Sequence, residues 1–375
     1  MQNIVAIADM KRGEGDGRLY SLDVLRGFDM FFIMGGDAVL LSLCWLLPTK
    51  WGSNVASQLG HPVWHGFTAY DLIFPLFLFI SGISFPFSFE KQIRKGNSLR
   101  DIRLRIVKRG LILIFLGIIY NGLFSFDFEN LRIASVLGRI GMAWMFAAMI
   151  ATCLGRKLRY VIMVILLFGY WALLSLVGAP DSNAGNLTME GNIVSYIDRV
   201  VLPGALHNKI HDPEGLLATI PTICTALLGI EVGEIVKKET WKSSCCRMLI
   251  WGVLLVLIGY FWGLYFPINK NLWTSSFVCL TGGISMLLFT IFYYLIDVCG
   301  CRKGTLFFRV IGINSITIYL AQQFIDFGFT TNVVFGGISN FFTPEWGRII
   351  LSLGYVLICW FFLWFLHKHR VYLKI

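Results

Sequence analysis

Long apolar runs restrict the fold of this chain more than any other feature. Ten stretches of roughly 20 residues, poor in charge, follow one another from residue 22 almost to the C-terminus. A helix of that length crosses a bilayer, and in lipid its backbone must satisfy its own hydrogen bonds. We therefore expect an all-α, polytopic helical membrane protein with about ten transmembrane helices. The expected spans are 22–47, 68–89, 104–123, 131–153, 159–178, 216–236, 248–266, 273–298, 306–327 and 346–367.

The composition agrees with a membrane protein. Of the 375 residues, 56% are hydrophobic and only 14% are charged, whereas about 25% are charged in an ordinary soluble domain. No polar stretch is long enough to form a soluble domain. We therefore expect a cytoplasmic tail over residues 1–20 and a single transmembrane domain over residues 21–375.

The basic residues predict the orientation. If the N-terminus is cytoplasmic, segments on that side carry about four times as many Lys and Arg as the exterior segments, as the positive-inside rule requires. Both termini are then cytoplasmic. Topology accounts for the net charge of +10, so we expect no nucleic-acid partner. The 9 cysteines show no paired CxxC pattern, so we predict neither a metal site nor a disulfide framework.

Two histidines mark the segment GHPVWHGFTAYDLIFP, which the topology places at the exterior face. His61 and His65 precede a long apolar run, and Asp71 stands at the start of that run. Imidazole can take up and release a proton near neutral pH, and a carboxylate such as Asp71 could orient it. The alternative is that both histidines are interfacial loop residues with polar tips in water.

Charged side chains also lie inside the first span. Asp23, Arg26 and Asp29 follow one another at intervals of three residues, which places them near one helical face. Asp37 lies about 16 Å beyond Arg26 along the same helix. One interpretation is an internal ion pair that only fixes helix packing. The other is a polar track that runs inward from the cytoplasmic surface and ends near Asp37.

A basic loop, KQIRKGNSLRDIRLRIVKR, follows the second span. Contact with anionic lipid would explain it, and so would a mouth that binds the phosphates of a nucleotide. Arg139 lies within a span, where a topology signal cannot explain it. Lys108 and Arg109 open the third span and could reach the same cavity as Arg139.

Two further segments carry polar groups next to apolar helices. HDPEGLLATIP opens the sixth span with His211, Asp212 and Glu214, and its carboxylates are typical of a helix start. GINSITIYLAQQF places Asn314 and Tyr319 in an apolar helix, where polar side chains form interhelical hydrogen bonds or line a pocket.

Six segments together resemble the heparan-α-glucosaminide N-acetyltransferase family. They run in order through nearly the whole chain: RLYSLDVLRGFDMFF, HPVWHGFTAYDLIFPLFLFISG, LRIASVLGRIGMAW, HDPEGLLATIPTICTALLG, PINKNLWTSSFVCLTGG and GINSITIYL. The first contains an Asp-x-x-Arg-Gly element that is similar to one in the wider transmembrane acyltransferases.

The resemblance implies transfer of the acetyl group of cytoplasmic acetyl-CoA across the membrane to the amine of a sugar, such as the terminal glucosamine of heparan sulfate. It implies that His61, in the H-x-x-W motif, is catalytic as general base or acetyl carrier. Asp71 or Asp37 would be its partner. The expected acetyl-CoA-binding residues are Arg26, Lys108, Arg109, Arg139, Asn314 and Tyr319. The expected substrate-binding residues are Trp64, His65, His211, Asp212 and Glu214.

The chain departs from the family at two of these positions. Family members often have Asn where His65 stands, and the lysosomal enzyme has Asn where Asp37 stands. The chain also has no luminal domain before its first span, so we expect a member from a bacterial inner membrane, or from the lysosomal membrane if the host is eukaryotic.

The expected partners are acetyl-CoA, an amino-sugar or glycosaminoglycan-derived acceptor and the lipid bilayer, with no metal. The chain could also assemble as a homodimer. The alternative function is a transporter that moves a sugar or anionic substrate without chemistry. Basic mouths and buried charges would suit it, but the sequence shows no inverted repeat of the kind common in transporters.

Overall fold

The structure is a computed structural model that describes residues 19–46, 49–180 and 182–373. In this part of the chain the regular elements are helices, and the one β-bridge joins Arg132 and Gly204. Within the same residues, 8 helical runs are long and apolar enough to cross a membrane. They are Tyr20–Leu46, Ala69–Arg94, Val136–Cys153, Arg156–Leu176, Thr219–Lys238, Trp241–Gly263, Ser275–Val298 and Pro344–Lys368. The all-α, polytopic membrane fold is therefore confirmed.

The other two expected spans differ from this pattern. The span expected at 104–123 lies in helix α6 (Leu99–Tyr120), whose first half carries many charged residues. The span expected at 306–327 is divided into α13 (Leu306–Ile313) and α14 (Ser315–Phe324). The backbone leaves the helical conformation at Asn314, with φ −112° and ψ 24°. The residues on both sides of this break are apolar, so hydropathy alone predicts one continuous span.

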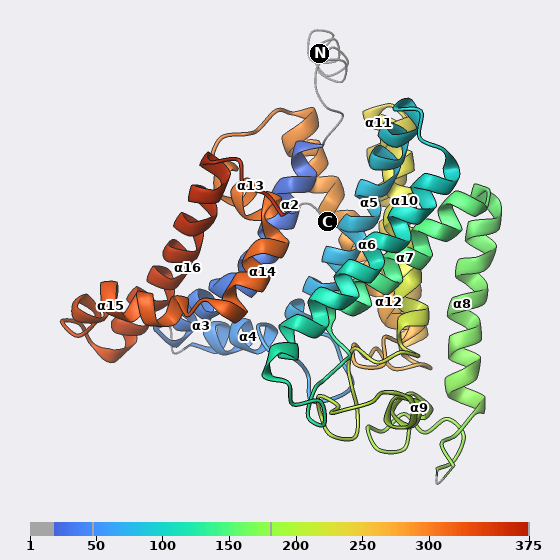
Figure 1. The fold of residues 1–375 in the computed structure, drawn as a ribbon, viewed down its shortest axis with the longest axis horizontal. Coiled ribbons are helices and arrows are strands. Elements are labelled where there is room, and N and C mark those ends of the chain that lie inside the picture. The colour runs from blue at the N-terminus through green and yellow to red at the C-terminus, as the bar shows by residue number, and fades with distance from the viewer. Residues whose placement is uncertain (1–18, 47–48, 181, 374–375) are drawn as a thin grey trace. The chain divides into compact units, whose positions relative to one another are not determined.

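The chain divides into two compact units, whose elements are labelled in Figure 1. The described part of unit 1 comprises residues 19–46, 49–61, 68–73 and 291–373. Unit 2 comprises Pro62–Phe67 and Phe74–Thr290. The expected cytoplasmic tail, residues 1–20, lies almost wholly outside the described residues, and the expectation of a single domain over residues 21–375 stays a prediction.

Unit 1 is a bundle of short and long helices. Besides α13 and α14 its elements are α2 (Tyr20–Phe31), α3 (Asp37–Leu46), α4 (Lys50–Gln58), a 3₁₀ turn (Ala69–Leu72), a π-helical end of α12 (Tyr293–Val298), α15 (Phe327–Ser339) and α16 (Pro344–Lys368). Helix α2 packs on α13, and α16 packs on α3, α13 and α15. Their apolar faces form one buried core, which includes Met30, Val310 and Leu363.

A wide turn bends the first membrane helix. Residues Phe32–Gly36 form a π-helical turn between α2 and α3, and Gly35 within it has φ 108°. That backbone conformation favours glycine, because a Cβ would clash there. The turn therefore breaks the continuous register of the helix just before Asp37.

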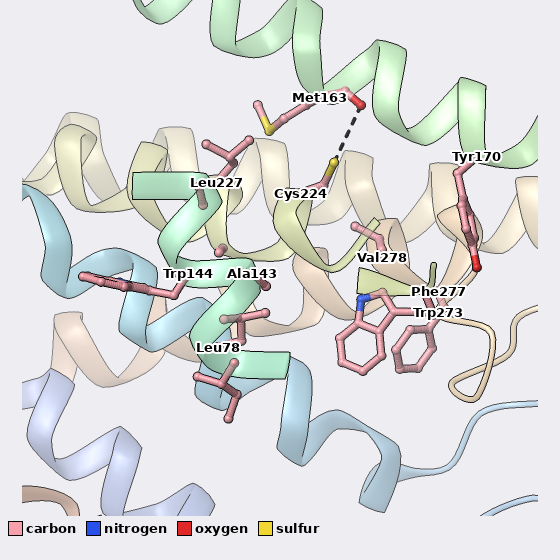
Figure 2. Close-up of a cluster of buried hydrophobic side chains, with 14 of the residues drawn as sticks. Leu78, Ala143, Trp144, Met163, Tyr170, Cys224, Leu227, Trp273, Phe277 and Val278 are labelled. Atoms are coloured by element: carbon pink, nitrogen blue, oxygen red, sulfur yellow. Dashed lines mark hydrogen bonds between the residues drawn. The ribbon is translucent and has the colours of Figure 1, made fainter. Parts of the chain in front are cut away.

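Unit 2 is built around helix α10 (Thr219–Lys238). Its other elements are α5 (Ile73–Arg94), α6, a 3₁₀ turn (Leu123–Ser125), α7 (Val136–Cys153), α8 (Arg156–Leu176), α9 (Ile193–Val201), α11 (Trp241–Gly263) and α12 (Ser275–Phe292). Helix α10 packs on α7, α8 and α11. Figure 2 shows a cluster of buried side chains that includes Leu78 from α5, Trp144 from α7, Tyr170 from α8, Leu227 from α10 and Phe277 from α12.

Helices α5 and α10 approach each other unusually closely. A Cβ on Gly229 would lie 2.1 Å from the carbonyl oxygen of Phe79, and one on Gly82 would lie 2.3 Å from the carbonyl oxygen of Ala226. Two backbones can come this near only where neither residue carries a side chain. The contact fixes α5 in unit 2 shortly after the histidine-containing segment.

Candidate active site

His61 and Asp71 form a hydrogen-bonded pair in unit 1. His61 Nδ1 lies 2.6 Å from Asp71 Oδ1, and the Asp71 side chain is fully buried while 48% of the His61 side chain is exposed. Because the Nδ1–H group is directed at a carboxylate, exchange of a proton with a substrate falls to Nε2. The arrangement can orient an imidazole as a general base or as a nucleophile.

Local structure explains why Asp71 lies at this position. The 3₁₀ turn Ala69–Leu72 begins after Thr68, and the Thr68 N–H group donates to Asp71 Oδ2 at 3.1 Å. The Thr68 hydroxyl donates to the carbonyl oxygen of Gly60 at 2.7 Å. Thr68 and Asp71 thus form a capping box, in which residues three apart satisfy each other's backbone groups at a helix start. The interaction that starts the membrane helix also holds the carboxylate beside His61.

Asp37 lies near the same histidine but does not bind it. Tyr70 donates its hydroxyl to Asp37 Oδ2 at 3.2 Å, and the Ala38 N–H group donates to Asp37 Oδ1 at 2.7 Å. The ring centroids of Tyr70 and His61 are 5.1 Å apart. Of the two carboxylates expected as partners of His61, Asp71 therefore contacts the imidazole, and Asp37 is connected to it through Tyr70. Sequence reasoning missed Tyr70, because one more aromatic residue at a membrane boundary carries no signal of its own.

The acetyl-CoA-binding residues expected in unit 1 are placed separately. Arg26 Nη1 lies 3.9 Å from Asp23 Oδ1, whereas Asp29 makes no ion pair among the described residues. Asn314 is buried at the break between α13 and α14. Tyr319 packs against the core of the unit. Among the described residues, Asp29 thus lies outside the ion pair that Asp23 and Arg26 form.

The loop Pro62–Phe67 belongs to unit 2, where Asn269 and Leu187 hold it. Trp64 Nε1 donates to the carbonyl oxygen of Leu187 at 2.7 Å, and Asn269 Nδ2 donates to the carbonyl oxygen of Trp64 at 2.9 Å. His65 Nδ1 lies 3.2 Å from Asn269 Nδ2. Burial lowers the pKa of His65 below its ordinary value. These anchors lie more than a hundred residues away in sequence, so the pattern of residues around Trp64 could not identify them.

His211 is fully buried and contacts Trp64. Its Nδ1 lies 2.8 Å from Ser195 Oγ, its ring centroid is 5.1 Å from that of Trp64, and its Nε2 has no hydrogen-bond partner among the described residues. Burial lowers the pKa of His211 to about 4, so the imidazole is neutral near pH 7. The structure therefore brings together two of the expected substrate-binding residues, although His211 is enclosed by protein.

The carboxylates Asp212 and Glu214 are bound by Arg132. Arg132 donates from Nε to Asp212 Oδ2 at 2.7 Å and from Nη2 to Asp212 Oδ1 at 2.6 Å, and it also pairs with Glu214. Burial alone would raise the pKa of Asp212, but Arg132 holds it below the ordinary value. Burial alone would likewise lower the pKa of Arg132, but the two carboxylates raise it. Both expected substrate-binding acids therefore already have a cationic partner.

Arg139 is enclosed beside the same loop, with only 1% of its surface exposed. It donates from Nε to Thr222 Oγ1 at 3.1 Å and from Nη1 to the carbonyl oxygen of Pro213. Its guanidinium lies 4.6 Å from the centroid of the Trp273 ring, and its Nη2 has no hydrogen-bond partner. The contacts of Arg139 thus lie around the segment that starts α10.

Lys108 and Arg109 lie on α6. Lys108 is exposed, and the guanidinium of Arg109 lies 4.3 Å from the centroid of the Trp144 ring. Lys108, Arg109 and Arg139 were expected to act together, and of these Lys108 is the exposed one. Among the described residues, no group of three or more His, Cys, Asp or Glu side chains could hold a metal ion.

Comparison with known proteins supports a distant relationship to a membrane acetyltransferase. A family model described as a domain of unknown function, DUF5009, matches residues 18–130. Heparan-alpha-glucosaminide N-acetyltransferase of Homo sapiens is 27% identical over 369 residues, which cover 82% of this chain and 53% of the human protein. The Mus musculus protein of the same name is 27% identical over 374 residues, which cover 84% of this chain and 55% of the mouse protein.

These matches confirm the resemblance that the sequence motifs carry. The chain is a distant homologue of the two enzymes, and it spans about half the length of the relatives that it matches.

Proposed function

We propose that this chain is a membrane-embedded acetyltransferase that transfers the acetyl group of acetyl-CoA to the amine of a glucosamine-type sugar. The observation that carries the proposal is the His61–Asp71 pair, in which a buried carboxylate orients a half-exposed imidazole at 2.6 Å. The distant relationship to two N-acetyltransferases supports it. We further propose that the acceptor binds from the exterior side and acetyl-CoA from the cytoplasmic side.

The chemistry needs a group that removes a proton. A sugar amine is mainly protonated in water and has no lone pair with which to attack a thioester. His61 Nε2 takes one proton from the ammonium group, and the neutral amine attacks the thioester carbonyl. The C–N bond forms, the C–S bond breaks, and the second proton of the nitrogen passes to the departing thiolate. The products are the acetamide, CoA thiol and one released proton, as balance requires.

A second route uses the same imidazole as a carrier. His61 Nε2 attacks the thioester carbonyl, the C–S bond breaks, and the departing thiolate takes one proton from the ammonium group. The neutral amine then attacks the acyl-imidazole, the C–N bond to the amine forms as the bond to Nε2 breaks, and the second proton is released to water. In both routes Asp71 stabilises the positive charge that develops on the ring. We propose Lys108 as a contact for the phosphates of acetyl-CoA, because it is a solvent-exposed cation.

The test is acetyl transfer from radiolabelled acetyl-CoA to glucosamine by the purified chain. We expect His61→Ala to lower the rate by about 10²–10⁴-fold, the usual contribution of a positioned acid or base. His207→Ala is the control, because His207 is an exposed histidine that contacts Asp212 through its backbone N–H group. The control should keep most of the activity.

The outcome also separates the alternatives. Label that stays on the wild-type protein without acceptor, and is absent from His61→Ala, indicates the acyl-imidazole route. Full activity in His61→Ala would remove His61 from the mechanism. If the wild type makes no product but vesicles that contain it accumulate unmodified sugar, the protein is a transporter.

A further inference from the structure

The carboxylate of Asp37 has no cationic partner in unit 1. It accepts hydrogen bonds from the Ala38 N–H group and from the Tyr70 hydroxyl, and no Lys, Arg or His lies within ion-pair distance of it among the described residues. Two other carboxylates of the candidate site are paired: Asp71 binds His61, and Asp212 binds Arg132. Charged groups at membrane depth are costly and usually have a partner or a functional role.

The hydrogen-bonding capacity of Asp37 is only half used. A carboxylate can accept about four hydrogen bonds, and the two that Asp37 accepts come one to each oxygen. Its side chain is partly exposed, so it is not enclosed by protein. A protonated primary amine supplies the missing charge together with N–H donors for the remaining lone pairs, and such charge-assisted hydrogen bonds are the stronger kind.

Tyr70 connects this carboxylate with the catalytic pair. Its hydroxyl is bound to Asp37, and its ring packs against the His61 ring at 5.1 Å. The wide turn at Phe32–Gly36 places Asp37 at the start of α3, and Tyr70 precedes Asp71 in the 3₁₀ turn. An amine bound to Asp37 is therefore separated from the imidazole by one phenol ring.

The geometry points to Asp37 as the subsite for the protonated amine of the acceptor, with Tyr70 as the residue that positions its carboxylate. The inference rests on the proposed function, because it assigns the acceptor class for the same reaction. The two carboxylates then have separate tasks. Asp71 is buried and orients His61, whereas Asp37 is accessible and binds charge. A carboxylate beside an ammonium favours the charged form, so Asp37 selects the protonated amine. The amine then leaves Asp37 and comes within hydrogen-bond distance of His61 Nε2, which removes its proton.

This assignment predicts a preference for cationic amines over sugars that offer only hydroxyl groups. The probes are glucosamine and glucose, which differ at one ring position, and binding to the purified full chain is measured by titration calorimetry. We expect the wild type to bind glucosamine more tightly than glucose. Asp37→Asn keeps the size of the side chain and an acceptor for the Tyr70 hydroxyl but removes the charge. It should weaken glucosamine binding by roughly 10- to 100-fold and leave glucose binding unchanged.

Two further variants complete the experiment. Tyr70→Phe keeps the ring beside His61 but loses the hydrogen bond to Asp37, so it should weaken glucosamine binding in the same direction and by a smaller factor, about tenfold or less. Asp326→Asn is the matched control, because Asp326 caps the start of α15 in the same unit through the Phe329 N–H group. The control should bind both sugars as the wild type does.

Steady-state transfer separates this inference from the proposed function. With glucosamine as acceptor, Asp37→Asn should raise KM by the same factor as the loss of binding and change kcat little. If the wild type transfers no acetyl group but Asp37→Asn still abolishes the preference for glucosamine, the proposed function fails and the subsite stands. The subsite is overturned if the wild type shows no preference, if Asp37→Asn retains it, or if that variant weakens both sugars equally.

Discussion

A buried carboxyl group in α9 should make the stability of the protein depend on pH. Asp198 is fully buried, its Oδ1 accepts a hydrogen bond from the Leu216 N–H group at 2.9 Å, and its Oδ2 has no hydrogen-bond partner in the part of the chain that the structure describes. Burial raises the pKa of Asp198 from its ordinary value of 3.8 to about 6. The folded protein therefore holds this proton more tightly than the unfolded chain does.

The sign and size follow from that difference. Between about pH 4 and pH 6 the folded state binds the proton and the unfolded state does not, so the free energy of unfolding falls as the pH rises through this window. The pKa differs by about 2 units, and each unit corresponds to 1.36 kcal/mol, so the total loss is about 3 kcal/mol and is complete above about pH 6. Asp198→Asn removes the titrating group and keeps an acceptor for the Leu216 N–H group.

The assay is thermal unfolding of the wild type and of Asp198→Asn in detergent between pH 4 and pH 7. Relative to the wild type, the variant should gain about 2–3 kcal/mol across this range, or a few degrees in Tm. Any constant cost of the new amide cancels, because only the change with pH is compared. Asp127→Asn is the control: Asp127 is fully solvent-exposed and hydrogen bonds from Asn130 lower its pKa, so the variant should show no such gain. A difference between wild type and Asp198→Asn that is the same at pH 4 and pH 7 would refute the reasoning.

Two further variants test the His61–Asp71 pair and the helix packing. Asp71→Asn removes the charge beside His61 at nearly constant shape. We expect it to lower kcat by at least about 10²-fold and to leave acetyl-CoA binding unchanged. If calorimetry shows that acetyl-CoA binding falls by the same factor, the role of Asp71 is structural. Gly229→Ala places a Cβ 2.1 Å from the Phe79 carbonyl oxygen, whereas Gly60→Ala meets nothing within 4 Å. We expect the first to destabilise the protein by about 1–3 kcal/mol in thermal unfolding and the second to have little effect, and equal Tm values would contradict the close approach of α5 and α10.

Local sequence rules could predict the contact between His61 and Asp71 but not all of its surroundings. Thr68 and Asp71 have the spacing of a capping box, which by itself places a carboxylate at the start of the second span. The link between Asp37 and Tyr70 depends on the wide turn at Phe32–Gly36. A regular helix of 3.6 residues per turn, which is what an apolar run predicts, would place Asp37 on a different face.

Residue patterns and spacings could not predict the interactions between segments that are distant in sequence. Arg132 and Asp212 are 80 residues apart in sequence and pair through two hydrogen bonds. The sequence alone presents Arg132 as a basic residue in a predicted exterior segment and Asp212 as an acidic residue before a helix, and neither description indicates that the two are paired. Likewise, the positions of most spans follow from hydropathy, whereas the helix break at Asn314 lies within a continuous apolar run that gives no sign of it.

The wide turn in the first membrane helix also affects how this chain should be compared with others. An additional residue within a helical turn rotates everything that follows by about 100° about the helix axis. Two homologous chains can therefore be aligned without a gap through residues 32–36 and still present position 37 to different surroundings, if only one of them has the wide turn. Substitutions at this position should be interpreted only after the register of the turn has been established in both proteins. An Asp and an Asn that share an alignment column need not share a neighbour.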